Sequence, residues 1–233
     1  MSTTDTISEQ RSLLVQALRH PRGRYTAERA SQLSGVPRST VYDWARNDVL
    51  IPDYALGRPM HWSYRDLVLL RLVAWLRSRD WAREAAAARA LLVRQVLTHS
   101  EVQPESVHTD GNVFLLDGES TDRLSGAQVF ESMVGLFDQF DLQLQIDEVQ
   151  LPRLWGPSLV APTPHTYISP WVMGGEPCVK DSRVPTASLL ALRDERGLSA
   201  EQVVALYPGI SSAVIVEAWD LESRLRRIEP AAA

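Results

Sequence analysis

The stretch TAERASQLSGVPRSTVYDW, residues 26–44, decides the fold of the N-terminal part of this chain. Thr26 is a favourable helix N-cap, and the small and apolar residues after it have helical spacing. Gly35 then suits a tight turn, and Arg38 to Asn47 have the pattern of a second helix. Helix, glycine turn and helix in this order predict a helix-turn-helix, with packing supplied by Val36, Val41 and Trp44.

The outer face of the second helix is rich in hydrogen-bonding side chains. These are Arg38, Ser39, Thr40, Tyr42, Asp43 and Arg46. In a helix-turn-helix the second helix enters the major groove of DNA, where such donors meet phosphates and base edges. The pattern therefore predicts a DNA-binding surface. An ordinary helical hairpin with a solvated face remains the alternative reading.

Charge is distributed unevenly along the 233 residues, although the net charge is only −5. Residues 20–94 hold 13 arginines against 7 acidic residues, a net charge of +6. Residues 100–150 hold one basic residue, Arg123, against 11 acidic residues, a net charge of −10. A basic N-terminal block favours contact with phosphates, while two oppositely charged solvated faces are the simpler alternative.

The residues after the second helix extend this pattern. Leu56 to Trp62 contains Gly57 and Pro59 and predicts an extended loop or wing. Ser63 can cap a helix over residues 64–79, and an alanine-rich helix follows at about 83–97. Residues 25–79 are therefore expected to be a winged helix-turn-helix domain, preceded at residues 1–24 by a polar tail and a short helix.

The middle of the chain predicts a connector, residues 80–150, that contributes to dimerisation. The Asp110-Gly111 turn signal predicts a strand pair over residues 107–116, followed by a helix at 127–140 and a strand at 142–149. The alanine-rich helix is a candidate dimer seam. A homodimer is expected because a two-fold operator doubles the contacts of one short recognition helix.

Five prolines in residues 151–170 predict a linker or an extended arm. Residues 171–233 then predict a hairpin around Gly174-Gly175 and helices at about 186–196, 199–206 and 211–226, with Ser199 and Ser211 as caps. Arg183 is placed to fix the hairpin to a helix through a charge-assisted hydrogen bond. The expected fold class is mainly α with small β elements.

Candidate partner-binding residues combine aromatic and cationic side chains, which are enriched at protein interfaces. They are Arg153, Trp155, Tyr167, Trp171, Arg224, Arg226 and Arg227. Burial of the two tryptophans in a core remains equally open at this stage. The three terminal arginines also fit a solvated helix end, where cations are favourable.

Enzyme, membrane and secreted classes are not favoured. The single thiol, Cys178, has no neighbouring histidine or carboxylate, and the five histidines are scattered without metal-ligand spacing. We therefore expect no catalytic residue, no metal and no cofactor. The N-terminus has no apolar signal segment, and the apolar run 67–76 is interrupted by Arg71, so a cytoplasmic protein without a membrane segment is expected.

Residues 25–79 resemble the winged helix-turn-helix of MerR-type regulators. The resemblance is carried by Tyr25 to Trp44, by Gly57-Arg58-Pro59 and by Trp62 to Leu67. It implies DNA contact from the second helix and from the wing residues Arg58 and His61, with Trp44 in the core. Met60 and His61 stand where the family usually has an aromatic residue and an arginine.

Residues 168–225 resemble the small antitoxin-like domains of VapB-type systems. The matching segments are Gly174 to Val179, Ser182 to Pro185, Gly197 to Val203 and Tyr207 to Ile210. The resemblance implies a type II antitoxin that binds and neutralises a cognate PIN-like ribonuclease toxin and represses its own operon by binding operator DNA. A MerR-like regulator with a small-effector-binding C-terminal region, and no toxin, is the alternative.

Overall fold

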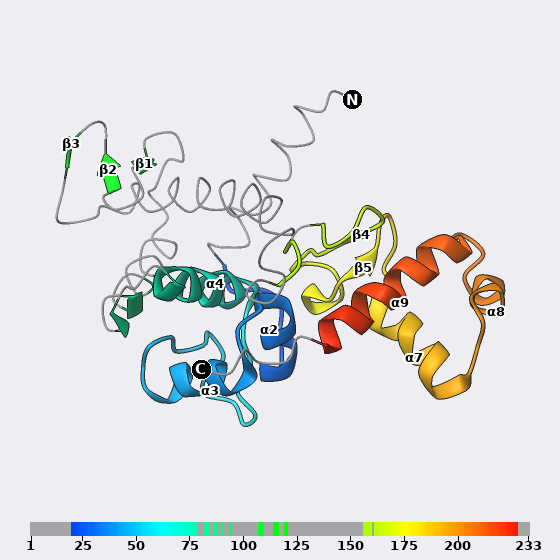
Figure 1. Ribbon diagram of the computed structural model, residues 1–233, viewed down its shortest axis with the longest axis horizontal. Helices are drawn as coiled ribbons and strands as arrows, with labels where there is room; N and C mark the ends of the chain where they lie inside the picture. The colour runs from blue at the N-terminus through cyan, green and yellow to red at the C-terminus, as the bar shows by residue number, and fades with distance from the viewer. Residues whose placement is uncertain are drawn as a thin grey trace.

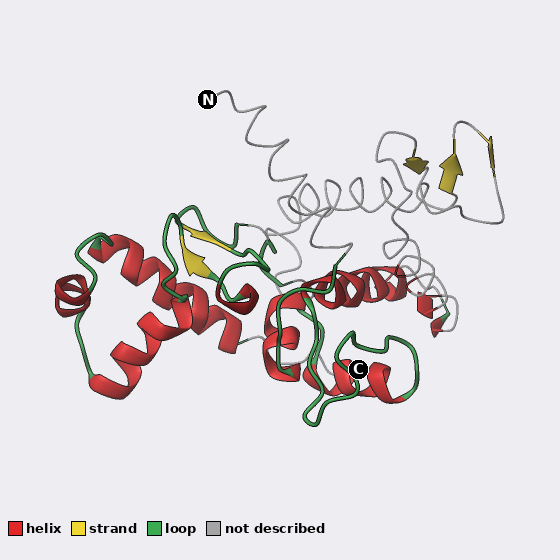
Figure 2. Ribbon diagram, turned by 180° about the vertical axis from the view of Figure 1, so that it is seen from behind, coloured by secondary structure: helices red, strands yellow, loops and turns green. Residues whose placement is uncertain are grey.

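The computed structural model describes residues 20–78, 156–159 and 161–227, with residues 82, 83, 86, 87, 90 and 94 and the segments 107–109, 114–116 and 119–120. Within these residues the fold is mainly helical with short antiparallel strands, as predicted (Figures 1 and 2). The predicted helix at 127–140 and strand at 142–149 lie outside the described residues, as does the tail 1–19. None of the described helices is long and apolar enough to cross a membrane.

The first helix pair is formed by α2 (Ala27–Ser34) and α3 (Arg38–Arg46), as predicted. The Thr26 hydroxyl accepts a hydrogen bond from the backbone N–H of Arg29 at 3.2 Å and so caps α2. Gly35 ends α2 with φ 76°, a left-handed conformation that is favourable for glycine. Val36, Val41 and Trp44 are buried, so the predicted packing between the two helices is confirmed.

Helix α4 (Tyr64–Ser78) begins where the Ser63 cap predicted. The Ser63 hydroxyl accepts a hydrogen bond from the N–H of Asp66 at 3.1 Å, and the Asp66 carboxylate accepts one from the N–H of Ser63 at 2.8 Å. This reciprocal arrangement satisfies two backbone donors at the helix start. Leu67 and Leu70 are fully buried and join α4 to the core formed with α2.

The described part of residues 80–150 is limited. Residues 83, 86, 87, 90 and 94 are helical, and Ala86 and Ala90 are buried in the same core as α2 and α4. Strands β1 (Val107–Thr109), β2 (Phe114–Leu116) and β3 (Glu119–Ser120) form an antiparallel sheet in the order β1-β2-β3. Thr109 lies opposite Phe114, which confirms the strand pair predicted on either side of the Asp110-Gly111 signal. Strand β3 was not predicted.

The described residues of the proline-rich segment, predicted to be a linker or an extended arm, are packed against the N-terminal helices, so the linker prediction is wrong for them and the extended-arm prediction is not tested. Leu159 and Ile168 are buried in the first core. The Tyr64 hydroxyl donates a hydrogen bond to the Leu159 carbonyl at 2.7 Å, and the Arg71 guanidinium donates to the Pro157 carbonyl. Buried donors on α4 thus hold carbonyl groups of a segment whose prolines cannot themselves donate.

Strands β4 (Thr166–Tyr167) and β5 (Cys178–Val179) form the second antiparallel pair, with Tyr167 opposite Cys178. The predicted hairpin therefore starts before Pro170, and its connection contains the short 3-10 helix η2 (Met173–Gly175). Both glycines of the predicted turn have positive φ angles, 69° at Gly174 and 91° at Gly175. The prediction of the two turn glycines is confirmed, but the first strand begins earlier than predicted, at Thr166.

Three helices complete the fold as predicted, namely α7 (Thr186–Arg196), α8 (Ala200–Leu206) and α9 (Ser212–Arg226). Ser199 and Ser211 cap α8 and α9 by accepting backbone hydrogen bonds, each at 3.4 Å. The helices enclose a second core around Leu189, Val203 and Trp219. Helix α9 lies against α7 and α8, and its C-terminal end reaches α2 (Figure 1).

Candidate nucleic-acid interface and partner surface

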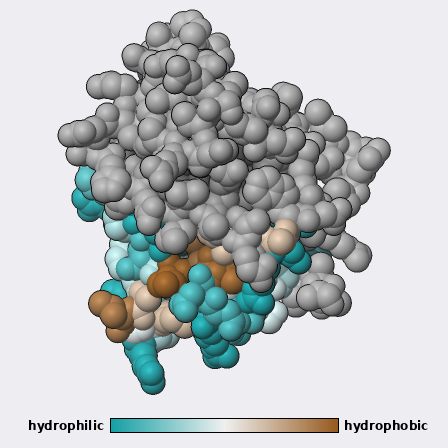
Figure 3. Space-filling view, turned by 90° about the vertical axis from the view of Figure 1, so that its left-hand side faces the viewer, coloured by the Kyte–Doolittle hydropathy of each residue, from teal (hydrophilic) through white to brown (hydrophobic). Residues whose placement is uncertain are grey.

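Helix α3 presents its predicted polar face to solvent. Arg38, Ser39 and Arg46 are exposed, and Thr40 and Tyr42 are half-buried. The buried residues of the helix, Val41 and Trp44, lie on its other side. Hydrophilic side chains also dominate the described residues on the face shown in Figure 3, where they border a smaller apolar area. The donors that the sequence singled out are therefore accessible.

Tyr42 organises this face. The guanidinium carbons of Arg38 and Arg46 lie 5.8 Å and 5.7 Å from the centre of the Tyr42 ring, within the range of cation–π attraction. The ring itself meets the buried Trp62 edge-on, with ring centres 5.7 Å apart and planes at 84°. Both arginines are thereby held by one aromatic ring that is fixed to the core.

Asp43 is the acidic residue on the same face, and its charge is compensated. Its carboxylate accepts hydrogen bonds from Arg83 at 2.7 Å and from the Asn47 amide at 2.6 Å. Arg83 comes from the helical residues after α4, so this ion pair also connects them to α3. Without the pair, Asp43 would repel an approaching phosphate.

The loop formed by residues 51–62 lies beside α3 and contains the predicted wing. Tyr54 and His61 form an antiparallel bridge, and the Arg58-Pro59 peptide bond is cis. Arg58 is exposed, as expected for a DNA contact, whereas His61 is half-buried with its Nδ1 enclosed and without a partner among the described residues. Leu56 is fully exposed. Of the two predicted wing contacts, Arg58 is the accessible one.

Carboxylates anchor this loop to the start of α4. Asp53 forms an ion pair with Arg65 at 2.5 Å, and the Asp66 carboxylate accepts the backbone N–H of Asp53 at 2.9 Å. Arg94 reaches the same group and pairs with Asp66. Burial and the neighbouring Asp53 charge raise the pKa of Asp66 to about 6. The loop is thus held by a compact network rather than by a regular sheet.

A buried charge cluster that the sequence did not reveal joins α2 to the C-terminal helices. The Arg29 guanidinium donates two hydrogen bonds to Glu222, at 2.9 Å and 2.8 Å, and one to Glu176 at 2.8 Å. The side chain of Glu222 is 3% exposed and that of Arg29 is 11% exposed. Burial lowers the pKa of Arg29, but hydrogen bonds and the charges of Glu222 and Glu176 raise it above its ordinary value.

Neighbouring contacts strengthen this junction. Thr186 at the start of α7 donates a hydrogen bond to Glu222 at 2.5 Å. The Tyr25 hydroxyl donates to the Gly175 carbonyl at 2.8 Å. A Cβ atom at Gly175 would lie 1.9 Å from that hydroxyl, so the close approach requires glycine. One signal in the sequence could have found this cluster, since Glu222 occupies a core position among the apolar residues of α9.

The expected clamp at Arg183 is wrong. Arg183 is exposed, and in the described part of the chain it makes no hydrogen bond or ion pair to a helix. Arg29 has the role that the sequence assigned to Arg183, but from a helix far away in the chain. The sequence did not reveal the role of Arg29, because this residue is far from Glu176 and Glu222 in the chain.

The predicted partner-binding residues are in different environments. Trp171 is 39% exposed and lies near Met173, which is 49% exposed. Tyr167 is half-buried and donates a hydrogen bond to the Ser182 carbonyl at 2.9 Å. Arg226 pairs with Asp194 at 2.8 Å. Arg153 and Trp155 lie outside the described residues.

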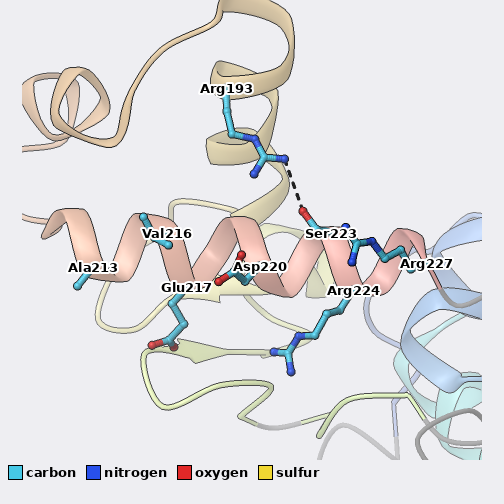
Figure 4. Close-up of a pocket in the computed structure, with 8 residues that line it drawn as sticks. All are labelled: Arg193, Ala213, Val216, Glu217, Asp220, Ser223, Arg224 and Arg227. Carbon is cyan, nitrogen blue, oxygen red and sulfur yellow. Dashed lines mark hydrogen bonds between the residues drawn. The ribbon is translucent and has the colours of Figure 1, made fainter.

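Arg224 and Arg227 line an open groove along α9, together with residues of both charges (Figure 4). Arg193 of α7 borders this groove, where its guanidinium reaches the Ser223 hydroxyl at 3.5 Å and lies 5.3 Å from the centre of the Trp219 ring. Glu217 accepts hydrogen bonds from the backbone N–H and the imidazole of His165, at 3.0 Å and 2.8 Å. Two of the three terminal arginines are therefore on one accessible face.

Comparison with known proteins bears on this C-terminal region. Residues 167–220 match a protein-family model. Its description is "Protein of unknown function (DUF433)". The match runs from β4 into α9 and overlaps the antitoxin-like segment expected from the sequence, residues 168–225. No curated protein and no solved structure matches the chain.

Proposed function

We propose that the chain is a cytoplasmic transcriptional repressor that binds DNA through a MerR-like winged helix-turn-helix. Helices α2 and α3 form the helix-turn-helix, and the loop 51–62 is the wing. The observation that carries this proposal is the exposed set Arg38, Ser39 and Arg46 on a helix that follows a tight glycine turn. Exposed guanidinium groups on such a helix suit phosphates and the acceptor edge of guanine.

Other features support the same surface. Arg58 is an exposed cation on the loop beside α3, and ion pairs of Asp53 with Arg65 and Arg94 hold that loop to the domain. Such a fixed loop can contact the sugar–phosphate backbone next to the groove that α3 enters. The Arg83 pair keeps the Asp43 charge from opposing this approach.

A gel-shift titration with the promoter of the chain's own operon tests the proposal. We expect retardation of the promoter fragment at a protein concentration that leaves an unrelated fragment unshifted. The affinity should fall steeply as salt rises, because bound cations displace counterions from DNA. Absence of retardation even at low salt would contradict DNA binding.

Tyr42 is expected to affect DNA binding without contacting a base. Replacing Tyr42 by Ala removes both cation–π contacts, each worth about 0.5–1 kcal/mol at an exposed site, and should weaken promoter binding by roughly 5- to 30-fold. Tyr42→Phe retains the ring and should bind within about twofold of wild type. Fluorescence anisotropy measures both affinities. Equal losses in the two variants would show that the hydroxyl, and not the ring, is responsible.

For the C-terminal region we propose neutralisation of a PIN-like ribonuclease toxin, as in a VapB-type antitoxin. The likeness of residues 168–225 to such domains supports this function. The exposed pair Trp171 and Met173 adds a physical reason, because exposed aromatic and methionine side chains are enriched at protein interfaces. The toxin would be encoded beside this chain and would dock over that pair.

Trp171→Ala is expected to weaken toxin binding by about 2 kcal/mol or more, which is typical of an aromatic hot spot. Copurification and calorimetry with the product of the adjacent open reading frame measure the effect. Leu206→Ala is a matched control, since Leu206 is 56% exposed on α8 and lies away from the pair in sequence. An adjacent product that is harmless on expression, or that does not copurify with the wild-type chain, would contradict the antitoxin proposal.

A further inference from the structure

Helix α9 has one buried and one exposed face. Its buried side contains Ile215, Trp219 and Leu225. The other side lines an open groove of about 750 Å³, together with Arg193 of α7. The α9 residues of the groove are, in order, Ala213, Val216, Glu217, Asp220, Ser223, Arg224 and Arg227 (Figure 4).

The charged residues on this exposed face are arranged around position 222 of the sequence. Each acidic residue before that position has a basic residue at the same distance after it. Asp220 and Arg224 lie two residues on either side of that position, and Glu217 and Arg227 lie five residues on either side. Both acidic groups thus occupy the N-terminal half and both cations the C-terminal half, and Figure 4 shows Glu217 and Arg224 projecting from the same side of α9. At 1.5 Å per residue, an antiparallel copy of the helix places each acid level with a cation.

Three of the four charges in this pattern are available. Asp220, Arg224 and Arg227 are exposed, and in the described part of the chain their side chains have no hydrogen-bond or ion-pair partner. The neighbouring Arg226, in contrast, is paired with Asp194. Val216, which is 43% exposed, adds apolar surface to the same face.

The Glu217 carboxylate is fixed in position by hydrogen bonds and is ionised. Burial raises its pKa, but hydrogen bonds from Thr163 and His165 lower it below the ordinary value for glutamate. Its carboxylate oxygens still have lone pairs for a further donor.

We propose that a second copy of this chain packs antiparallel along the exposed face of α9, with a two-fold axis at the level of residue 222 along the helix. The axis brings Asp220 of each copy against Arg224 of the other, and Glu217 of each against Arg227 of the other. Such an interface is isologous, because every contact occurs twice. The inference does not depend on DNA or toxin binding, and it places a dimer contact outside the connector 80–150.

Charge reversal tests the proposal in the full chain. Asp220→Arg or Arg224→Asp alone creates two like-charge contacts in each dimer, so sedimentation should report dimerisation weakened by at least about tenfold. When the two variant chains are mixed, each charged position meets an opposite charge again, and a heterodimer should form. The double variant, with both substitutions in one chain, should also dimerise.

Lys180→Glu provides the control, because it reverses one exposed charge that is not on α9 and does not line the groove, and it should leave dimerisation unchanged. Circular dichroism verifies that each variant is folded. A wild-type chain that stays monomeric at micromolar concentration overturns the proposal. It is also overturned if both single reversals leave the dissociation constant unchanged, if mixing fails to restore the dimer, or if the reversals weaken only the capture of another protein.

Discussion

Arg29→Ala is expected to destabilise the fold by about 3–5 kcal/mol, because it leaves a buried carboxylate without its cation. Glu222 is 3% exposed, and Arg29 supplies two of its hydrogen bonds. In the described part of the chain the other donor to Glu222 is Thr186, whose hydroxyl cannot neutralise the charge. Urea unfolding followed by circular dichroism measures the change. The loss should loosen α9 from α2, and therefore the C-terminal region from the helix pair that we propose binds DNA.

A double replacement separates two quantities. One is the net contribution of the ion pair to stability, and the other is the cost of leaving a buried charge without its partner. Arg29→Met combined with Glu222→Leu removes both charges and retains apolar volume, so its stability should lie much closer to wild type than that of Arg29→Ala. Glu176→Ala is a milder comparison, since Glu176 is 31% exposed and solvent screens its charge. An Arg29→Ala chain that unfolds at the wild-type urea concentration would show that the cluster contributes nothing to stability.

The combined replacement of Arg38 and Arg46 by alanine should nearly abolish promoter binding. Each arginine contributes about 1–3 kcal/mol if it contacts a base, so the double variant should bind at least about 30-fold more weakly. If either cation binds a phosphate instead, the slope of log affinity against log salt should fall by about 0.9 for each phosphate that is no longer neutralised. Anisotropy titrations at several salt concentrations distinguish these outcomes. The fold should remain intact, because both side chains are exposed.

Arg183→Ala combined with Lys180→Ala is the matched control. It also removes two exposed cations, but from the C-terminal region. This variant should keep promoter affinity within a few tenths of a kcal/mol, which is usual for exposed positions away from a site. Equal losses in the two double variants would mean that α3 has no special role and that net charge alone attracts DNA.

Local signals in the sequence predicted most of the described helices. Thr26, Ser63, Ser199 and Ser211 mark helix starts in the sequence, and in the structure each lies directly before a helix that its hydroxyl caps. These predictions succeeded because a cap and its helix are neighbours in sequence, so no distant contact is needed to interpret them.

The predictions that failed depended on distant contacts. The proline-rich segment resembled a linker, because nothing in residues 151–170 reveals that Tyr64 and Arg71 donate hydrogen bonds to its carbonyl groups. The start of the C-terminal hairpin was predicted too late for a different reason, since a two-residue strand has no periodicity to detect.

The candidate DNA-binding face has features that local sequence signals predicted and a feature that depends on a distant contact. Arg38 and Arg46 were predicted from their spacing along one helix, and they are exposed as expected. The ring of Tyr42 between them is oriented by Trp62, which belongs to a different segment. The sequence could therefore name the donors, but not the side chain that positions them.

By itself the sequence determined the helices, their caps, the glycine turn after α2 and the donor-rich face of α3. These features follow from the preferences of residues within one or two turns of each other. Only the tertiary structure decided that Arg29 joins Glu222, 193 residues away, and that the proline-rich segment packs against α4. A buried charge must find its partner in space, and that partner is set by how the helices pack rather than by the residues next to it in the chain.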